Sequence, residues 1–228
     1  MLTQSAATAQ QPRPQPPFAF PTGRKASPTE MRAPIGVVMS FGRNAEIYAE
    51  GESSGYVYKV ISGVVRVSKL LPDGRRQISA FHLPGEMFGF EAGELHHASA
   101  EAVVPVKLVA FKWDGLLGVA EQPINVVREL LSLAVIGLRH TQDLLLLLGR
   151  KSALERLAAF LLEMDRRTGS THKLDLAMPR HDIADYLGLT LETVSRMFAE
   201  LKELGAIKLE SARRVHLLNL DRLTAMSA

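Results

Sequence analysis

The stretch RHDIADYLGLTLETVSR, residues 180–196, constrains the fold of this chain more than any other part of the sequence. Gly188 divides it into two short segments with helical spacing, and Ala184 is small enough to let two helices cross closely. Thr190 is placed to cap the second helix through its hydroxyl. The apolar residues that would lock the second helix against the first are Ile183, Leu187, Leu189 and Val194. The stretch therefore predicts a helix-turn-helix.

A compact polar triplet lies on the second of these helices. Glu192, Ser195 and Arg196 are spaced i, i+3 and i+4, so they project from one face near the N-terminal end of the helix. An arginine fork can bind O6 and N7 of guanine, and a glutamate can accept from N4 of cytosine. We therefore identify the triplet as candidate base-reading residues. The alternative is an ordinary helical pair in which Glu192 and Arg196 form a surface ion pair of about 0.3–0.5 kcal/mol.

The residues around this motif predict a winged helix over residues 150–228. An amphipathic helix ends near Gly169, residues 172–178 have the pattern of a short strand, and residues 207–217 alternate as a hairpin. The agreement of turn, cap and wing favours DNA binding over the ordinary helical pair. The candidate phosphate contacts are Arg180, Thr190, Thr193, Lys208, Arg213 and Arg214. For the charged members of this set, the alternative is a solvated surface charge.

The N-terminal half divides into a proline-rich tail and a β-rich domain. Residues 1–35 hold seven of the twelve prolines and predict a disordered tail, because such a segment buries too little apolar surface to fold. Residues 36–120 hold short β-branched and aromatic segments, at 56–61, 64–67, 77–81 and 106–111, punctuated by glycines at intervals of 9 to 12 residues. This texture predicts a β-roll, with a hairpin turn at Pro72-Asp73-Gly74.

Residues 121–149 predict a long helix with an apolar seam. Its positions alternate in steps of four and three over about three heptads, which suits a partner helix in a coiled coil. The seam consists of Val127, Leu131, Ala134, Leu138, Thr141, Leu145 and Leu148. The alternative is a helix packed on its own domain, and both arrangements can hold at once. The longest uncharged run is nine residues, well below the roughly 18 that a membrane span needs, so we expect no membrane partner.

Composition excludes several kinds of site. The chain has no cysteine, which rules out disulfides, thiolate zinc sites, iron–sulfur clusters and thiol switches. The histidines of the β-rich domain, His82, His96 and His97, form no spaced ligand set, so surface or loop histidines are favoured over a metal or haem site. We expect no catalytic residues, no metal and no cofactor. The first 35 residues show no secretory signal, and we expect a cytoplasmic protein.

These motifs together resemble the Crp/Fnr family of bacterial transcription regulators over residues 36–225. LETVSR at 191–196 matches the Glu-x-x-Ser-Arg signature of the Fnr-like branch, while LLGRKSALER at 147–156 and FLLEMD at 160–165 look most like FixK-type regulators. The resemblance implies an α+β fold with an N-terminal cupin-like β-roll, a long dimerisation helix and a C-terminal winged helix-turn-helix. It also implies a homodimeric activator that works with RNA polymerase and reads TTGA-type half-sites in double-stranded DNA, with Arg196 on guanine.

The β-roll lacks the clamp that the cyclic-nucleotide branch of this family uses. That branch holds its ligand with a Glu and an Arg-Ser pair, whereas Phe90 and His96 stand in the corresponding stretch here. The cysteines of the oxygen-sensing branch are missing as well. We therefore expect a regulator that acts without a small-molecule effector. Two alternatives stay open: a haem-based, nitric-oxide-responsive regulator of the same branch, and a metal- or ligand-binding β-roll whose C-terminal helices only mediate assembly.

Overall fold

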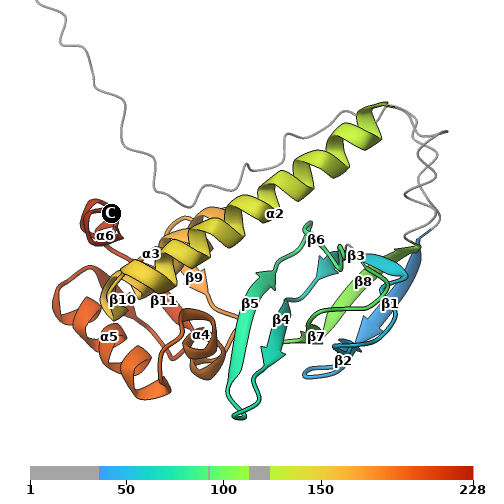
Figure 1. The fold of residues 1–228 in the computed structure, drawn as a ribbon. Coiled ribbons are helices and arrows are strands. Elements are labelled where there is room, and N and C mark those ends of the chain that lie inside the picture. Colours follow the sequence, from blue (N-terminus) through green and yellow to red (C-terminus); the bar gives the residue numbers. More distant parts are fainter. Residues whose placement is uncertain (1–35, 92, 113–123, 228) are drawn as a thin grey trace, which may run out of the picture.

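The computed structural model describes residues 36–91, 93–112 and 124–227. A β-roll and a helical domain lie side by side, and a long helix, α2, runs along both of them (Figure 1). The predicted proline-rich tail, residues 1–35, lies outside the described residues, as does the segment 113–123 that precedes α2. The order of roll, long helix and helical domain confirms the predicted α+β fold.

The β-roll consists of two four-stranded sheets in the orders β1-β8-β3-β6 and β2-β7-β4-β5. The strands are β1 (Val37–Phe41), β2 (Glu46–Tyr48), β3 (Tyr56–Ser62), β4 (Val65–Leu70), β5 (Arg76–His82), β6 (Met87–Phe88), β7 (Ser99–Ala102) and β8 (Val106–Lys112). The four predicted segments correspond to β3, β4, β5 and β8. Strands β2, β6 and β7 span two to four residues, which is too short for an alternating pattern to be recognised.

The predicted hairpin turn joins β4 to β5. The backbone N–H of Leu71 donates to the carbonyl oxygen of Arg75 at 2.8 Å, and Gly74 has a φ of +83°. Glycine adopts this conformation without the steric cost of a Cβ. The turn places Arg76 at the start of β5, the strand that lies against the helical domain (Figure 1).

Two consecutive helices, α2 and α3, follow the roll in the sequence, and α3 is the first helix of the C-terminal domain. Helix α2 spans Ile124–Arg150, so it ends one residue beyond the predicted boundary at residue 149. Helix α3 spans Ala153–Thr168. Ser152 and Glu155 form a reciprocal capping box at its start, which satisfies free N–H groups at the helix end. Gly169, with a φ of +60°, ends α3 at the predicted position.

The C-terminal domain is a winged helix, as predicted. It contains β9 (Lys173–Asp175), α4 (Arg180–Leu187), α5 (Leu191–Glu203), β10 (Ile207–Leu209), β11 (Arg214–Leu217) and a final helix, α6 (Leu220–Ser227), which the sequence reading missed. The three strands form one antiparallel sheet in the order β10-β11-β9, and β10 and β11 make the wing hairpin.

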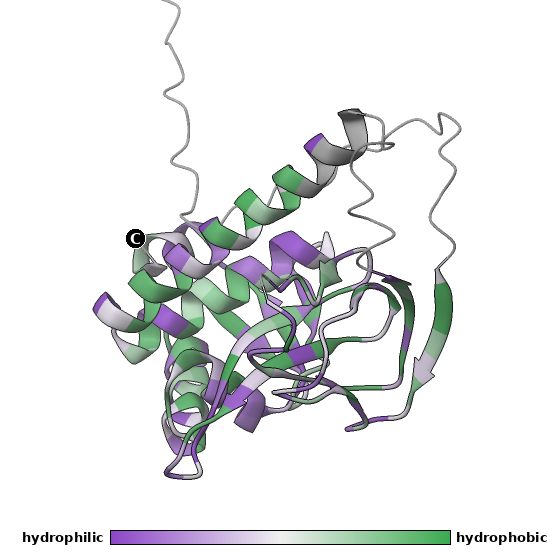
Figure 2. Ribbon diagram, turned by 45° about the vertical axis from the view of Figure 1, so that its right-hand side comes forward, coloured by the Kyte–Doolittle hydropathy of each residue, from purple (hydrophilic) through white to green (hydrophobic). Residues whose placement is uncertain are grey.

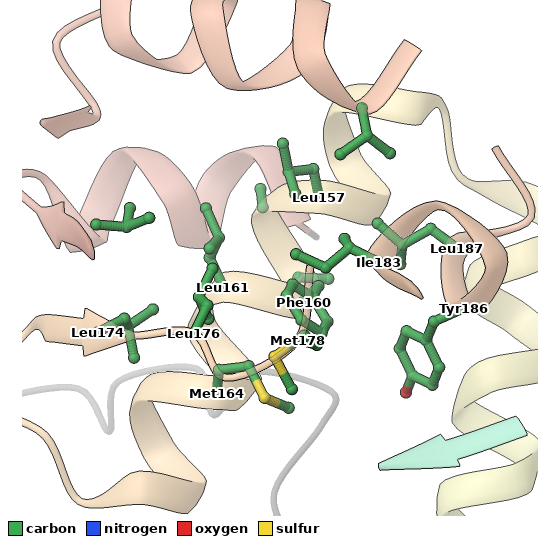
Figure 3. Close-up of a cluster of buried hydrophobic side chains, with 14 of the residues drawn as sticks. Leu157, Phe160, Leu161, Met164, Leu174, Leu176, Met178, Ile183, Tyr186 and Leu187 are labelled. Atoms are coloured by element: carbon green, nitrogen blue, oxygen red, sulfur yellow. The ribbon is translucent and has the colours of Figure 1, made fainter. Parts of the chain in front are cut away.

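The core of this domain extends into the β-roll. Figure 3 shows Leu157 and Leu161 of α3 gathered with Ile183 and Leu187 of α4, and all four side chains are fully buried. Phe81 of β5 belongs to the same buried cluster, with its ring centroid 5.3 Å from that of Tyr186 on α4. One apolar cluster therefore spans the winged helix and the adjoining part of the roll, and the roll contains a second cluster of its own.

Candidate nucleic-acid interface

The turn between α4 and α5 has the geometry that the sequence predicted. Gly188 ends α4 with a φ of +61°, and its backbone N–H bonds to the carbonyl oxygen of Ala184. Thr190 has extended backbone angles, and its hydroxyl accepts from the backbone N–H of Thr193 at 3.2 Å. The hydroxyl thus satisfies one of the free N–H groups at the start of α5. The helix-turn-helix and its cap are confirmed.

Helix α5 has one buried face and one exposed face. Val194, Phe198 and Leu201 pack into the core with at most 2% of each residue exposed. The predicted triplet of Glu192, Ser195 and Arg196 is exposed to solvent on the other face. The first half of α5 therefore presents an acceptor, a hydroxyl and a guanidinium together, which is the chemistry that base edges in the major groove require.

Local hydrogen bonds make Glu192 and Ser195 hydrogen-bond acceptors. Bonds from its own backbone N–H and from the hydroxyl of Thr190 hold the pKa of Glu192 below its ordinary value, and the charge of Arg196 acts in the same direction. The carboxylate is therefore an acceptor at neutral pH. The hydroxyl of Ser195 donates to the carbonyl oxygen of Leu191 at 2.8 Å, so its oxygen remains an acceptor.

The predicted phosphate contacts fall into two surface groups, in which Thr193 and Arg213 are half-buried, and one exception. Thr190 and Thr193 share a hydroxyl–hydroxyl contact of 3.1 Å at the start of α5. Lys208 lies exposed on β10, while Arg213 and Arg214 lie at the wing turn, with Arg214 exposed. The backbone N–H groups of both arginines donate to the hydroxyl of Ser211, which shapes that turn.

Arg180 is the exception. Its guanidinium carbon lies 3.0 Å from the centroid of the Phe198 ring, and its Nη1 is buried with no hydrogen-bond partner among the described residues. Burial lowers the pKa of Arg180 to about 10. The side chain therefore packs between α4 and α5. The sequence predicted a phosphate contact for Arg180, and this packing holds its guanidinium away from the exposed cations.

The predicted dimer seam lies mostly on an exposed face of α2. Leu131, Leu138 and Leu145 are 60–71% exposed, and Ala134 and Thr141 are exposed as well. Figure 2 shows hydrophobic residues along the part of α2 that projects beyond the helical domain.

Other residues near the end of α2 pack on the chain itself. Leu144 and Leu147 are buried in the core, and the seam residue Leu148 is half-buried against it. The side chain of Val127 lies outside the described residues. The alternative of a helix packed on its own domain therefore holds at the end of α2, and the exposed part of the seam remains a predicted dimer contact. By length and composition alone, the stretch Leu131–Arg150 also resembles a membrane span, which the sequence reading did not expect.

An aromatic stack occupies the interior of the roll near the positions that replace the cyclic-nucleotide clamp. The ring of His96 stacks on Tyr48 at 3.6 Å, and Tyr48 in turn lies 5.7 Å from Tyr58 and 6.2 Å from Phe88, centroid to centroid. His96 is 2% exposed, and its Nδ1 lies 3.4 Å from a Glu91 carboxylate oxygen.

The other residues named in the roll lie around this stack. Phe90 is 39% exposed, and His97 is also exposed. The ring of His82 stacks on that of Phe88 at 5.1 Å. Within the described ranges, no group of three or more His, Asp or Glu side chains is arranged to hold a metal ion.

A set of ion pairs between the roll and α4 was not predicted from the sequence. Asp182 and Asp185 of α4 pair with Arg66 of β4 and Arg76 of β5. A signal was available, because Asp182, Asp185 and Tyr186 are spaced i, i+3 and i+4 and share a helix face. The local sequence does not indicate, however, that these carboxylates pair with Arg66 and Arg76.

Comparison with known proteins identifies the family. Residues 155–226 match the model of the Crp-like helix-turn-helix domain, and residues 38–122 match that of the cyclic nucleotide-binding domain. The nitrogen fixation regulation protein FixK of Azorhizobium caulinodans is 45% identical over 208 residues, which cover 89% of this chain and 84% of that protein. The chain belongs to the Crp/Fnr family of transcription regulators, in its FixK-type branch.

The FixK-type assignment agrees with the fold. The structure of FixK2 from Bradyrhizobium japonicum matches with a TM-score of 0.82 and 46% identity, covering 85% of this chain and 98% of that chain. A further relative, the transcriptional activator protein Anr of Pseudomonas aeruginosa, is 33% identical over 187 residues, covering 79% of this chain and 76% of that protein. The resemblance drawn from the motifs is thus confirmed, and the Crp/Fnr relatives are transcription regulators, a class distinct from enzymes.

Proposed function

We propose that this chain is a homodimeric, sequence-specific activator of transcription that reads a palindrome of TTGA-type half-sites without a bound effector. The observation that carries the proposal is the exposure of Glu192, Ser195 and Arg196 on a helix whose opposite face is fully buried. The buried face fixes the helix in the domain, so the exposed triplet is free to enter the major groove. In this assignment Arg196 binds guanine, and Glu192 and Ser195 bind neighbouring bases.

The exposed seam of α2 supports a symmetric dimer. Leu131, Leu138 and Leu145 expose apolar surface along one side of a long helix, and a second copy of the same helix would bury it. A two-fold axis along this seam presents the triplet twice, so a palindromic site is the matching target. The same dimer accounts for the apolar stretch Leu131–Arg150 without a membrane, and we place the protein in the cytoplasm with DNA and RNA polymerase as partners.

The packing of the roll supports activity without an effector. Tyr48, Tyr58, Phe88 and His96 stack on one another near the positions that replace the cyclic-nucleotide clamp. No arginine stands there to pair with a cyclic phosphate, because His96 occupies the corresponding position. The proposal therefore includes no cofactor, metal or small-molecule ligand.

Fluorescence anisotropy with the purified protein and no additive tests the proposal. We expect a labelled TTGA-type palindrome to bind at least about 10³-fold more tightly than a scrambled duplex of equal length, at one stated salt concentration. Equal binding of the two duplexes would contradict sequence reading. A visible spectrum and metal analysis of the same sample distinguish the alternatives, because a Soret band or stoichiometric metal would replace the effector-free account with a haem or metal protein.

A further inference from the structure

Helix α4 lies between α5, the proposed recognition helix, and the β-roll (Figure 1). Ile183, Ala184 and Leu187 are buried in the core that also contains Val194 of α5. Asp182, Asp185 and Tyr186 lie on another face and contact β4 and β5 of the roll. A change in the orientation of α4 on the roll would therefore be passed to α5, which packs on both α4 and α3.

The carboxylate of Asp182 is the centre of the contact with the roll. It is fully buried, and each of its oxygens accepts from a different arginine: Oδ2 from Nη1 of Arg66 at 2.8 Å, and Oδ1 from Nη2 of Arg76 at 2.5 Å. Arg76 also donates through Nε to Asp185 at 2.8 Å. We name Arg66, Arg76, Asp182 and Asp185 the interdomain latch.

A neighbouring strand of the roll holds Arg66 in a fixed direction. Arg66 is opposite Glu101 in the pairing of β4 with β7, and its Nε donates to that carboxylate at 3.0 Å. Gln77, the neighbour of Arg76 on β5, donates through Nε2 to the carbonyl oxygen of Tyr186 at 3.2 Å. Arg66 thus has hydrogen-bond partners on both sides of the interface, and each of the other three charged groups has at least one partner across it, which a buried charge requires.

Such a network is a poor means of gaining stability alone. Well-packed apolar side chains of similar volume commonly stabilise an interface as well as or better than a buried ion pair does. Apolar contacts tolerate sliding, however, whereas charge-assisted bonds on both oxygens of one carboxylate are satisfied in a single register. The latch therefore defines one orientation of α4 on the roll.

We propose that the latch is a positioning device: it fixes the separation of the two recognition helices in the dimer and thereby selects the spacing between half-sites, with no effector needed. The inference rests on the proposed function, because spacing has meaning only for a dimer on a palindrome. Arg66, Arg76, Asp182 and Asp185 touch no base in this account, and they act through α4 and α5.

The test measures selectivity for half-site spacing with the full-length protein. Anisotropy titrations use palindromes of TTGA-type half-sites with five consecutive spacer lengths, each one base pair longer than the last. We expect wild type to prefer one spacing by at least about tenfold, since a one-base-pair change also rotates one half-site about the DNA axis. Asp182→Asn and Arg76→Ala should lower this preference to about threefold or less.

Arg75→Ala is the matched control. Arg75 is the neighbour of Arg76 but pairs with Asp73 inside the hairpin, and 78% of its side chain is exposed. Its replacement should leave spacing selectivity unchanged. Asp185→Asn is a milder second variant, because 29% of the Asp185 side chain is exposed and the substitution should preserve the fold. It tests the latch if the Asp182→Asn protein does not fold.

The outcomes separate the latch from the proposed function. Loss of spacing preference with a preserved dimer and melting profile supports positioning. A uniform loss of affinity at all spacings, or unchanged spacing preference in the latch variants, overturns the latch while wild type still separates palindrome from scrambled DNA. If wild type binds both duplexes equally, the proposed function itself fails.

Discussion

Arg156 of α3 donates from Nη1 to the carbonyl oxygen of Leu187, the last residue of α4, at 2.9 Å. Its Nη2 donates at 2.9 Å to the carbonyl oxygen of Leu148, in the last turn of α2. One planar guanidinium thus satisfies two carbonyl groups at helix ends. The end of the long helix and the turn of the helix-turn-helix are therefore held together beside Gly188.

Gly188→Ala should destabilise the protein through the backbone. A Cβ there would meet Cδ2 of Leu148 at 3.5 Å and Nη1 of Arg156 at 3.6 Å, which are ordinary contacts, so the cost comes from the φ of +61°. We expect a loss of about 1–2 kcal/mol in the free energy of unfolding, measured by urea denaturation. Gly149→Ala is the control: it lies in α2 with open space around it and should be neutral or slightly stabilising. Equal effects of the two substitutions would disprove the role of the turn.

Leu138→Glu should convert the dimer to monomers. Leu138 is 60% exposed, so the fold of one chain tolerates the change, while two buried charges would face each other at the seam. We expect a loss of about 3 kcal/mol or more in dimer stability, measured by light scattering across a dilution series. Leu70→Glu is the control, because Leu70 is 66% exposed on β4 of the roll. A Leu138→Glu protein that stays as dimeric as the Leu70→Glu protein would place the interface elsewhere.

His82 should make a destabilising contribution in mild acid. Burial lowers the pKa of His82 from 6.5 to about 3, and the Arg167 cation acts in the same direction. At a pH between these two pKa values, His82 is protonated in the unfolded chain and neutral in the folded chain. Its contribution to the free energy of unfolding therefore falls as the pH falls below 6.5. At pH 5.5 the loss amounts to about 1.4 kcal/mol.

His82→Gln should remove this contribution in urea titrations between pH 7.5 and 5. A pH dependence remains, because burial also lowers the pKa of His140 to about 4 and raises that of Glu163 to about 7, and these two groups act in opposite directions. His97→Gln, at an exposed position, serves as the comparison and should keep the wild-type slope. An identical slope in all three proteins would refute the assignment to His82.

Lys208 should contribute to DNA affinity through phosphate and not through bases. Lys208→Ala is expected to weaken binding to every duplex similarly and to lower the slope of log affinity against log salt by about one per contact, hence about two per dimer. Lys107→Ala, an exposed lysine on β8 of the roll, should leave the slope unchanged. The same slope for wild type and Lys208→Ala would leave Lys208 a solvated surface charge.

The helix-turn-helix was predictable because its residues carry local constraints. The positive φ of Gly188 and the cap made by Thr190 follow from the chemistry of single residues and their neighbours. The exposed triplet follows from helical spacing alone. These features need no knowledge of distant parts of the chain.

The features that the sequence did not reveal depend on distant contacts. Arg180 was expected at a phosphate, yet the ring of Phe198 on the next helix holds its guanidinium. Arg66 and Asp182 are 116 positions apart, and only the packing of the roll on α4 brings them together. Leu148 continues the heptad pattern but packs on its own domain, because α2 enters the core there.

The most direct test of base reading compares wild type with Arg196→Ala on three duplexes. They are the TTGA-type palindrome, the same palindrome with the guanine of each half-site replaced, and a scrambled sequence. We predict that wild type discriminates strongly and that Arg196→Ala loses about 1–3 kcal/mol of that discrimination, with binding to scrambled DNA changed much less. Equal losses by Arg196→Ala on the palindrome and on scrambled DNA would show that Arg196 does not read a base, and would contradict the account.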